Sequence, residues 1–252
     1  MKIGAQLYTI REYTKNAADF AASMEKIART GYRYVQISAI GDIPAKEVAD
    51  VCASNGLEIV VTHTNQDKVR DDYESVIEDH RIMGAKYVGI GAMPGNYPRS
   101  ESGVMKFIED YTPAAEAFEK SGMMFMYHNH DFEFEKYGKK SMFDYLIGDF
   151  PLVGFILDTY WVQAAGGDPS AWIKKLSGRV PVIHFKDMTW ARGGIRMAEV
   201  MEGNMNWPAI FAACPPAGVE YAMVEQDHCY ERNPFDSLKI SFDNLKGVFA
   251  NG

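Results

Sequence analysis

A repeated unit constrains the fold of this chain more than any other feature: a helical pattern ends at a glycine, and an apolar strand pattern follows. Glycine suits the left-handed position just beyond a helix end. In the N-terminal half these glycines are Gly31, Gly56, Gly84 and Gly122. Over the whole chain the apolar runs predict eight strands, at residues 3–7, 34–37, 58–61, 87–90, 123–127, 155–157, 182–185 and 221–225.

Helical patterns separate these strands, and such alternation of near-continuous apolar strands with helices predicts a parallel sheet. Eight strand–helix units in 252 residues fit an α/β fold of the closed (β/α)8 TIM barrel type, and we expect one domain over residues 1–252. A doubly wound open sheet is the second choice, because no GxGxxG motif follows the first strand. The later helical patterns lie at about residues 66–83, 100–121, 139–149, 168–177, 206–213 and 235–250.

Local sequence also marks helix starts and loops. Asn16 with Asp19 is typical of an N-cap pair, and Asp42 ahead of Pro44 predicts the start of a second helix. A TIM barrel builds its active site from the loops that follow the strands. The longest irregular stretches after strand ends are residues 91–100, 128–140 and 187–205.

Composition excludes several classes of protein. The formal net charge of −8 disfavours nucleic acid as a partner, since such binding needs a basic surface. No apolar stretch reaches transmembrane length, so we expect no membrane association, and without a signal-peptide pattern we expect a cytoplasmic protein. The three cysteines have no CxxC spacing, which argues against disulfides and a zinc ribbon; they are Cys52, Cys214 and Cys229.

Three late strands each end in a residue that can bind a metal: Asp158, His184 and Glu225. Side chains alternate along a strand, so these residues share a face with the apolar residues two positions earlier and point into the barrel mouth. A single polar residue at a strand end more often only contacts water. Three such residues on consecutive strands favour a metal-binding site. The set suits one divalent metal ion, Mn²⁺, Co²⁺, Mg²⁺ or Zn²⁺. We expect Glu133 as the fourth ligand, with His130 as its competitor.

Other residues near strand ends are candidates for substrate contact. His128 is expected to support the site or touch substrate rather than bind the metal. The alternative for His63 is a purely structural role, and the alternative for Lys186 is a solvent-exposed position at the rim. For the aromatic residues the alternative is packing without any contact to substrate. Arg192 and Arg196 beside Gly193 are only weak signs of a phosphate site. The substrate-binding candidates are Tyr8, His63, His128, Trp161, Lys186 and Trp190.

The chain resembles the sugar phosphate isomerase/epimerase family, part of the xylose isomerase-like TIM barrels that also form the AP endonuclease family 2 superfamily. The resemblance lies in three strings: residues 127–134 (YHNHDFEF), 157–161 (LDTYW) and 184–187 (HFKD). It implies one metal held by Glu133, Asp158, His184 and Glu225. Ketose 3-epimerases and endonuclease IV have a histidine where this chain has Trp161, so the resemblance does not extend to those activities.

These residues predict a metal-dependent isomerase or epimerase that acts on a sugar or polyol through an enediolate. Glu225 is expected to act as one acid/base, and Glu133 or His130 as the other. A dehydratase of a keto-sugar or keto-inositol that uses the same metal site is the first alternative, because an enediolate can expel a neighbouring hydroxyl. A glycoside hydrolase and a non-catalytic sugar-binding subunit are further alternatives. Homo-oligomer formation is left open, because no interface signature is present.

Overall fold

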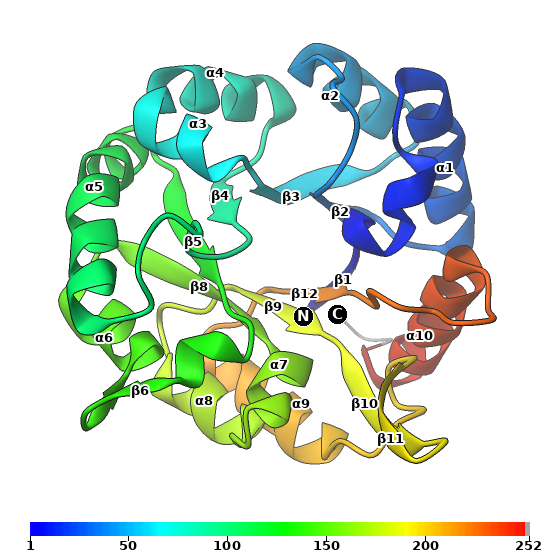
Figure 1. The fold of residues 1–252 in the computed structure, drawn as a ribbon. Helices are drawn as coiled ribbons and strands as arrows, with labels where there is room; N and C mark the ends of the chain where they lie inside the picture. The colour runs from blue at the N-terminus through cyan, green and yellow to red at the C-terminus, as the bar shows by residue number, and fades with distance from the viewer. Residues whose placement is uncertain (250–252) are drawn as a thin grey trace.

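The computed structural model describes residues 1–249, and within them eight parallel strands close into a barrel (Figure 1). The predicted (β/α)8 TIM barrel is thus confirmed; the single domain over 1–252 remains a prediction, because residues 250–252 lie outside the described part. The order around the barrel is β1-β12-β9-β8-β5-β4-β3-β2. The strands are β1 (Lys2–Gln6), β2 (Tyr34–Ile37), β3 (Glu58–His63), β4 (Tyr87–Ile90), β5 (Met124–His128), β8 (Val153–Asp158), β9 (Val182–Phe185) and β12 (Tyr221–Val224).

Helices surround the barrel and cover the outer face of its strands (Figure 1). The pattern predicted at 235–250 corresponds to the last helix, although residue 250 lies outside the described residues. The helices are α1 (Ala17–Thr30), α2 (Ala45–Ser54), α3 (Gln66–Asp71), α4 (Tyr73–Met83), α5 (Glu101–Lys120), α6 (Met142–Asp149), α7 (Thr159–Ala164), α8 (Pro169–Lys175), α9 (Trp207–Ala217) and α10 (Pro234–Phe249).

The helix starts follow the local sequence in one case and depart from it in another. The Asn16 side chain accepts a hydrogen bond from the Asp19 N–H at 3.0 Å, which confirms the predicted cap of α1. Asp42 does not begin α2, because Pro44 occupies the N-cap position and has no side-chain cap bond. The pattern at 66–83 is two helices, since the backbone at Asp72 is not helical.

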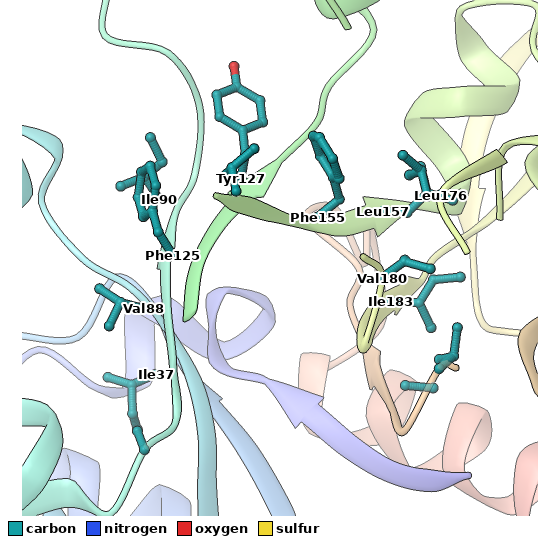
Figure 2. Packing of buried hydrophobic residues seen from close by; sticks show 14 of the residues in the cluster. Ile37, Val88, Ile90, Phe125, Tyr127, Phe155, Leu157, Leu176, Val180 and Ile183 are labelled. Carbon is teal, nitrogen blue, oxygen red and sulfur yellow. The ribbon is translucent and has the colours of Figure 1, made fainter. Parts of the chain in front are cut away.

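Alternation along the strands divides the apolar residues into two layers. The outer layer lies between strands and helices; Figure 2 shows Phe155, Leu157 and Ile183 among its members. The inner layer fills the barrel and includes Ile156 and Val182. Residues two positions further along the same strands therefore lie at the inner mouth, which is how Asp158 and His184 reach the barrel axis.

The loops at the barrel mouth contain more structure than their sequence predicted. Residues 187–205 include a hairpin of β10 (Asp187–Ala191) and β11 (Gly194–Ala198), paired antiparallel. Residues 128–140 include the short 3-10 helix η2 (Phe132–Phe134) and strand β6 (Lys136–Tyr137), which pairs with β7 (Lys140–Ser141). Residues Leu7–Tyr13 form the 3-10 helix η1 rather than extending β1. Within residues 1–249, no helix combines the length and apolar character needed to cross a bilayer.

Candidate functional site

Four buried side chains meet at the mouth of the barrel: His128, Asp158, His184 and Glu225. Each offers one nitrogen or oxygen atom, and these four atoms lie within 4.8 Å of one another. The residues come from the carboxyl ends of β5, β8, β9 and β12, which are consecutive neighbours in the barrel. Three of the four are residues that the strand-end pattern predicted as metal ligands.

Each of the four side chains is oriented by a hydrogen bond on the side away from the common centre. His128 Nδ1 lies 2.9 Å from the Gly91 carbonyl oxygen, and His184 Nε2 lies 2.8 Å from Gln36 Oε1, so both rings donate outward. Asp158 Oδ1 accepts from the Trp161 N–H, and Glu225 Oε1 accepts from Gln6 Nε2. Such outer contacts fix the tautomer and direction of metal ligands.

The side-chain atoms that point toward the common centre are arranged to bind a cation rather than to form hydrogen bonds with one another. His184 Nδ1 and Glu225 Oε2 are 2.8 Å apart, yet both are buried without a hydrogen bond of acceptable geometry. His128 Nε2 and His184 Nδ1 face Asp158 Oδ2 at 3.4 and 3.6 Å. With their outer nitrogens donating, the two imidazoles in their neutral form present lone pairs to two carboxylates. Buried groups left in this state call for an ion, and the donor set suits a divalent metal.

Lys186 adds a buried positive charge beside this group. Its ammonium lies 3.6 Å from Asp158 Oδ2, 3.5 Å from Glu225 Oε2 and 2.7 Å from Asp227 Oδ1. Burial alone would lower the pKa of Lys186, but the three carboxylates outweigh it and raise the pKa above its ordinary value. Lys186 is therefore charged at neutral pH and joins the site as a fixed cation.

The same neighbours control the ionisation of the other groups. Burial would raise the pKa of Asp158, but Lys186 and the two imidazoles hold it well below its usual range. Burial would lower the pKa of His184, but Glu225 and Asp158 raise it to about 9. In the absence of a cation, a proton on His184 therefore offsets part of the negative charge that a metal would otherwise neutralise.

A cavity of about 470 Å³ opens above the four residues. That volume lies within the range of about 300–1,000 Å³ that is usual for small-molecule sites. Its walls include six residues named from the sequence: Tyr8, His63, His128, His130, Lys186 and Glu225. The remaining walls carry hydroxyl and amide groups, among them Ser38, Thr64, Asn65 and Gln66.

Glu133 does not join the four-residue group, and His128 lies in the place expected for it. The chain turns into η2 after β5, and the Glu133 carboxylate is buried against its own loop. Its oxygens accept hydrogen bonds from the Tyr127 hydroxyl at 2.8 Å and the His130 N–H at 2.7 Å. Burial raises the pKa of Glu133 to about 7, although both hydrogen bonds oppose the shift. In this structure, Glu133 supports the loop that carries His130.

The histidines and tryptophans named from the sequence divide between the cavity and the surface. His130 packs against the rings of His128 and Trp161, and burial together with His128 lowers its pKa to about 3. His63 lies beside the His128 ring, with its Nε2 buried and unpartnered. Trp161 faces the Lys186 ammonium. Trp190 lies outside the cavity, 67% exposed on the β10–β11 hairpin.

Several residues of the site were not anticipated from the sequence. Asp227 lies two positions after Glu225, just beyond the end of β12, and this short separation from a predicted ligand was a usable signal. Gln6 is the last residue of β1 and Gln36 the last but one of β2, and both are buried polar residues near the end of a strand, as Asp158 is. By contrast, no sequence signal indicated that the Gly91 carbonyl orients His128.

Comparisons with known proteins agree with this architecture. No curated protein matches the chain. Among solved structures, a sugar phosphate isomerase/epimerase from Parabacteroides distasonis ATCC 8503 is 22% identical, with a TM-score of 0.81 over 98% of this chain and 94% of that one. A D-allulose 3-epimerase from Methylomonas sp. is 14% identical, with a TM-score of 0.73 over 98% of this chain and 97% of that one.

A third solved structure is the probable 3-DHS dehydratase involved in petrobactin synthesis from Bacillus anthracis. It is 15% identical, with a TM-score of 0.73 over 98% of this chain and 99% of that one. At these identities the three structures establish a shared fold. Residues 24–233 match the family model described as xylose isomerase-like TIM barrel, which is most of the chain. The chain therefore belongs to the xylose isomerase-like TIM barrel family, as its sequence motifs indicated.

Proposed function

We propose that this protein is a divalent-metal-dependent isomerase or epimerase of a sugar or related polyol. One observation carries the proposal: His184 Nδ1 and Glu225 Oε2 are buried and unpartnered beside Asp158 Oδ2 and His128 Nε2, beneath the cavity. A divalent cation held by these four residues supplies a Lewis acid that stabilises negative charge on a carbonyl oxygen. The metal could be Mn²⁺, Co²⁺, Mg²⁺ or Zn²⁺.

The residues of the chain supply the proton transfers. We assign removal of the proton beside the carbonyl to the Glu225 carboxylate, which lines the cavity and whose Oε1 accepts a single bond, from Gln6. Return of a proton is assigned to His130, whose neutral ring lines the cavity and whose Nδ1 is buried without a partner; the ring relays a proton from solvent, taking one up at one nitrogen as it gives one up at the other. Glu133 positions His130, because its carboxylate accepts a hydrogen bond from the His130 backbone N–H. Return to the other face gives an epimer, and return to the other carbon gives an isomer.

A dehydratase is the second candidate, because the same enediolate can expel a neighbouring hydroxyl. The support for it is the similarity in fold to the solved structure named as a probable dehydratase. The two candidates differ in one product: only the dehydratase releases water from the substrate.

The proposal is tested with protein that has been stripped of metal by a chelator and then reloaded with each of the four cations. A panel of keto-sugars and keto-inositols is incubated in D₂O, and products are identified by NMR and mass spectrometry. We expect solvent deuterium on the carbon beside the carbonyl only in the metal-loaded protein. Loss of water from the product would identify the dehydratase.

Two variants make the test specific. Glu225→Gln should abolish deuterium incorporation, because the amide can neither take the proton nor bind the cation as a carboxylate does. Glu220→Gln, at the opposite end of the barrel and exposed, should retain it. Activity that survives exhaustive chelation, or that survives Glu225→Gln, would show that the proposed chemistry is wrong.

A further inference from the structure

The charged side chains on the cavity wall are few and are already paired. Within residues 1–249, the carboxylate, ammonium and guanidinium groups that line the cavity are Lys186, Glu225 and Asp227. Lys186 contacts both of these carboxylates and also Asp158 beneath them. Its single positive charge is therefore shared among three negative charges, and none of it is free for a ligand.

The charges of the site cancel once a divalent cation is present. Asp158, Glu225 and Asp227 carry three negative charges, and Lys186 offsets one of them. The imidazoles that bind a metal are neutral. A divalent cation neutralises the remaining two charges, so the loaded site has no excess positive charge. A phosphate dianion placed beside Asp227 and Glu225 would meet two carboxylates at short range and one engaged ammonium.

No arginine lines the cavity among the described residues, and Arg99 lies over the Phe132 ring. Arg11 donates to the backbone carbonyls of Tyr8 and Asp227, so its N–H groups are engaged outside the cavity. Arg192 pairs with Glu231 at 2.7 Å, and Arg196 lies over the Tyr230 ring. The weak sign of a phosphate site at Arg192 and Arg196 is thus accounted for by contacts away from the cavity.

The opposite wall carries groups that suit hydroxyls. Ser38, Thr64, Asn65 and Gln66 follow β2 and β3 and line the cavity, where the Thr64 hydroxyl also bonds Thr62 Oγ1 and Gln66 Nε2 donates to the Ala92 carbonyl oxygen. Hydroxyl and amide groups both donate and accept hydrogen bonds, as the hydroxyls of a polyol do. Asn65 uses its oxygen to cap the Lys68 N–H, and its amide nitrogen remains for a ligand. The N-terminus of α3 is thereby already capped.

We infer that the cavity takes an uncharged polyhydroxylated carbonyl compound and discriminates against its phosphate ester. The inference rests on the proposed function and adds to it the charge of the substrate. Asp227 is the residue that we identify as a determinant of this specificity, because it holds the Lys186 ammonium at 2.7 Å and places a negative charge on the cavity wall.

Calorimetry on the Mn²⁺-loaded protein tests the inference without reference to turnover. Matched pairs are D-fructose with D-fructose 6-phosphate and D-ribulose with D-ribulose 5-phosphate. We expect the neutral member to bind at least about tenfold more tightly, which corresponds to about 1.4 kcal/mol. A phosphate ester that binds as tightly as its neutral partner, or binding by neither member of any pair, would overturn the inference.

Asp227→Asn provides a second arm, because it removes one negative charge and keeps an oxygen for Lys186. The preference for the neutral ligand should shrink severalfold in Asp227→Asn and stay unchanged in Asp50→Asn, which removes an exposed charge on α2. An unchanged preference in Asp227→Asn would contradict the role of Asp227.

The two proposals fail in different ways. Tight binding of neutral sugars without deuterium exchange would count against the proposed function alone. Metal-dependent exchange on a phosphate ester would support the proposed function and overturn the inference.

Discussion

Lys186 is an ammonium group buried among three carboxylates, and its energetic role follows from that environment. Removing one partner from a buried ion network leaves uncompensated charge, which costs more than the loss of an exposed pair. In the metal-free protein Lys186 and a proton on His184 offset two of the three negative charges of Asp158, Glu225 and Asp227. Lys186 should therefore stabilise the metal-free barrel and weaken its attraction for a cation.

The variant Lys186→Met tests this role. We expect the free energy of unfolding of the metal-free protein to fall by about 3–5 kcal/mol, because two buried carboxylates and the partly buried Asp227 lose their counter-charge. Chemical denaturation with chelator present measures the change. Lys46→Met, which removes an exposed lysine paired with Asp50, should change stability by no more than about 1 kcal/mol. Equal stabilities for the two variants would contradict the proposed balance.

His80 links stability to pH at a position away from the metal ligands. Its Nδ1 lies 2.7 Å from the Val76 carbonyl oxygen and its Nε2 lies 2.9 Å from Thr62 Oγ1. Burial lowers the pKa of His80. As pH falls below the unfolded-state value of about 6.5, the unfolded chain takes up a proton that the folded protein resists. The His80 contribution to stability is present above that pH and is lost as pH falls.

Urea denaturation between pH 8 and pH 5 measures this linkage. We expect the wild-type protein to lose more stability over that range than His80→Gln, whose side chain does not titrate. Substitution of the exposed His228 by glutamine should leave the wild-type profile unchanged. Parallel profiles for wild-type protein and His80→Gln would show that His80 makes no such contribution.

At the scale of elements, the Asp187 carboxylate holds together the long loop after β9. Its Oδ2 accepts hydrogen bonds from the Met201 N–H, the Gly203 N–H and Trp207 Nε1. These contacts join the start of the β10–β11 hairpin to the start of α9. The loop therefore has a fixed path beside the barrel mouth, although its sequence predicted irregular structure.

Gly203→Ala should break this arrangement, because an added Cβ would meet Asp187 Oδ1 and the Met188 carbonyl oxygen, both at 2.4 Å. Overpacking of this kind costs typically about 1–3 kcal/mol. Thermal and urea unfolding measure the loss. Gly194→Ala is the matched control, because nothing lies within 4 Å of its added Cβ and stability should hardly change. Similar losses in both variants would mean that the loop tolerates displacement from Asp187.

The barrel strands could be predicted from the sequence, but the hairpin could not. The ranges for β2, β4 and β9 agree with the structure residue for residue, because strands buried on both faces are continuous apolar runs. β10 and β11 lie outside the barrel and are partly exposed, so their residues lack that pattern. Their turn has positive φ at Arg192 and Gly193, which favours a tight hairpin.

The sequence predicted those residues of the candidate site whose direction is set by the alternation of side chains along a strand. Asp158, His184 and Glu225 continue the inward-facing positions of their strands, so their convergence followed from the fold. The fourth position depended on the path of a loop. There the Glu133 carboxylate bonds to the His130 N–H and turns away, while His128 ends β5 and points inward. Local hydrogen bonding in a loop is not visible in the periodicity of a sequence.

At the scale of the whole molecule, the four candidate ligands lie on β5, β8, β9 and β12 and meet only when those strands are assembled. A cation that binds this group therefore binds the folded protein and not the separated strands of the unfolded chain. By mass action, such a ligand raises the free energy of unfolding as its concentration increases. Metal binding and the stability of half the barrel should thus be coupled.

Unfolding measured at increasing concentrations of Mn²⁺, Co²⁺, Mg²⁺ or Zn²⁺ tests that coupling. For a cation that binds the site, the gain should reach about 2.7 kcal/mol at a concentration one hundred times its Kd. Asp158→Asn should remove most of the gain, because it replaces the carboxylate whose Oδ2 faces both imidazoles. Asp50→Asn should keep the full gain, since that residue lies exposed on α2. A gain of equal size in both variants would place the cation elsewhere and would separate the stability of the barrel from the four strand-end residues.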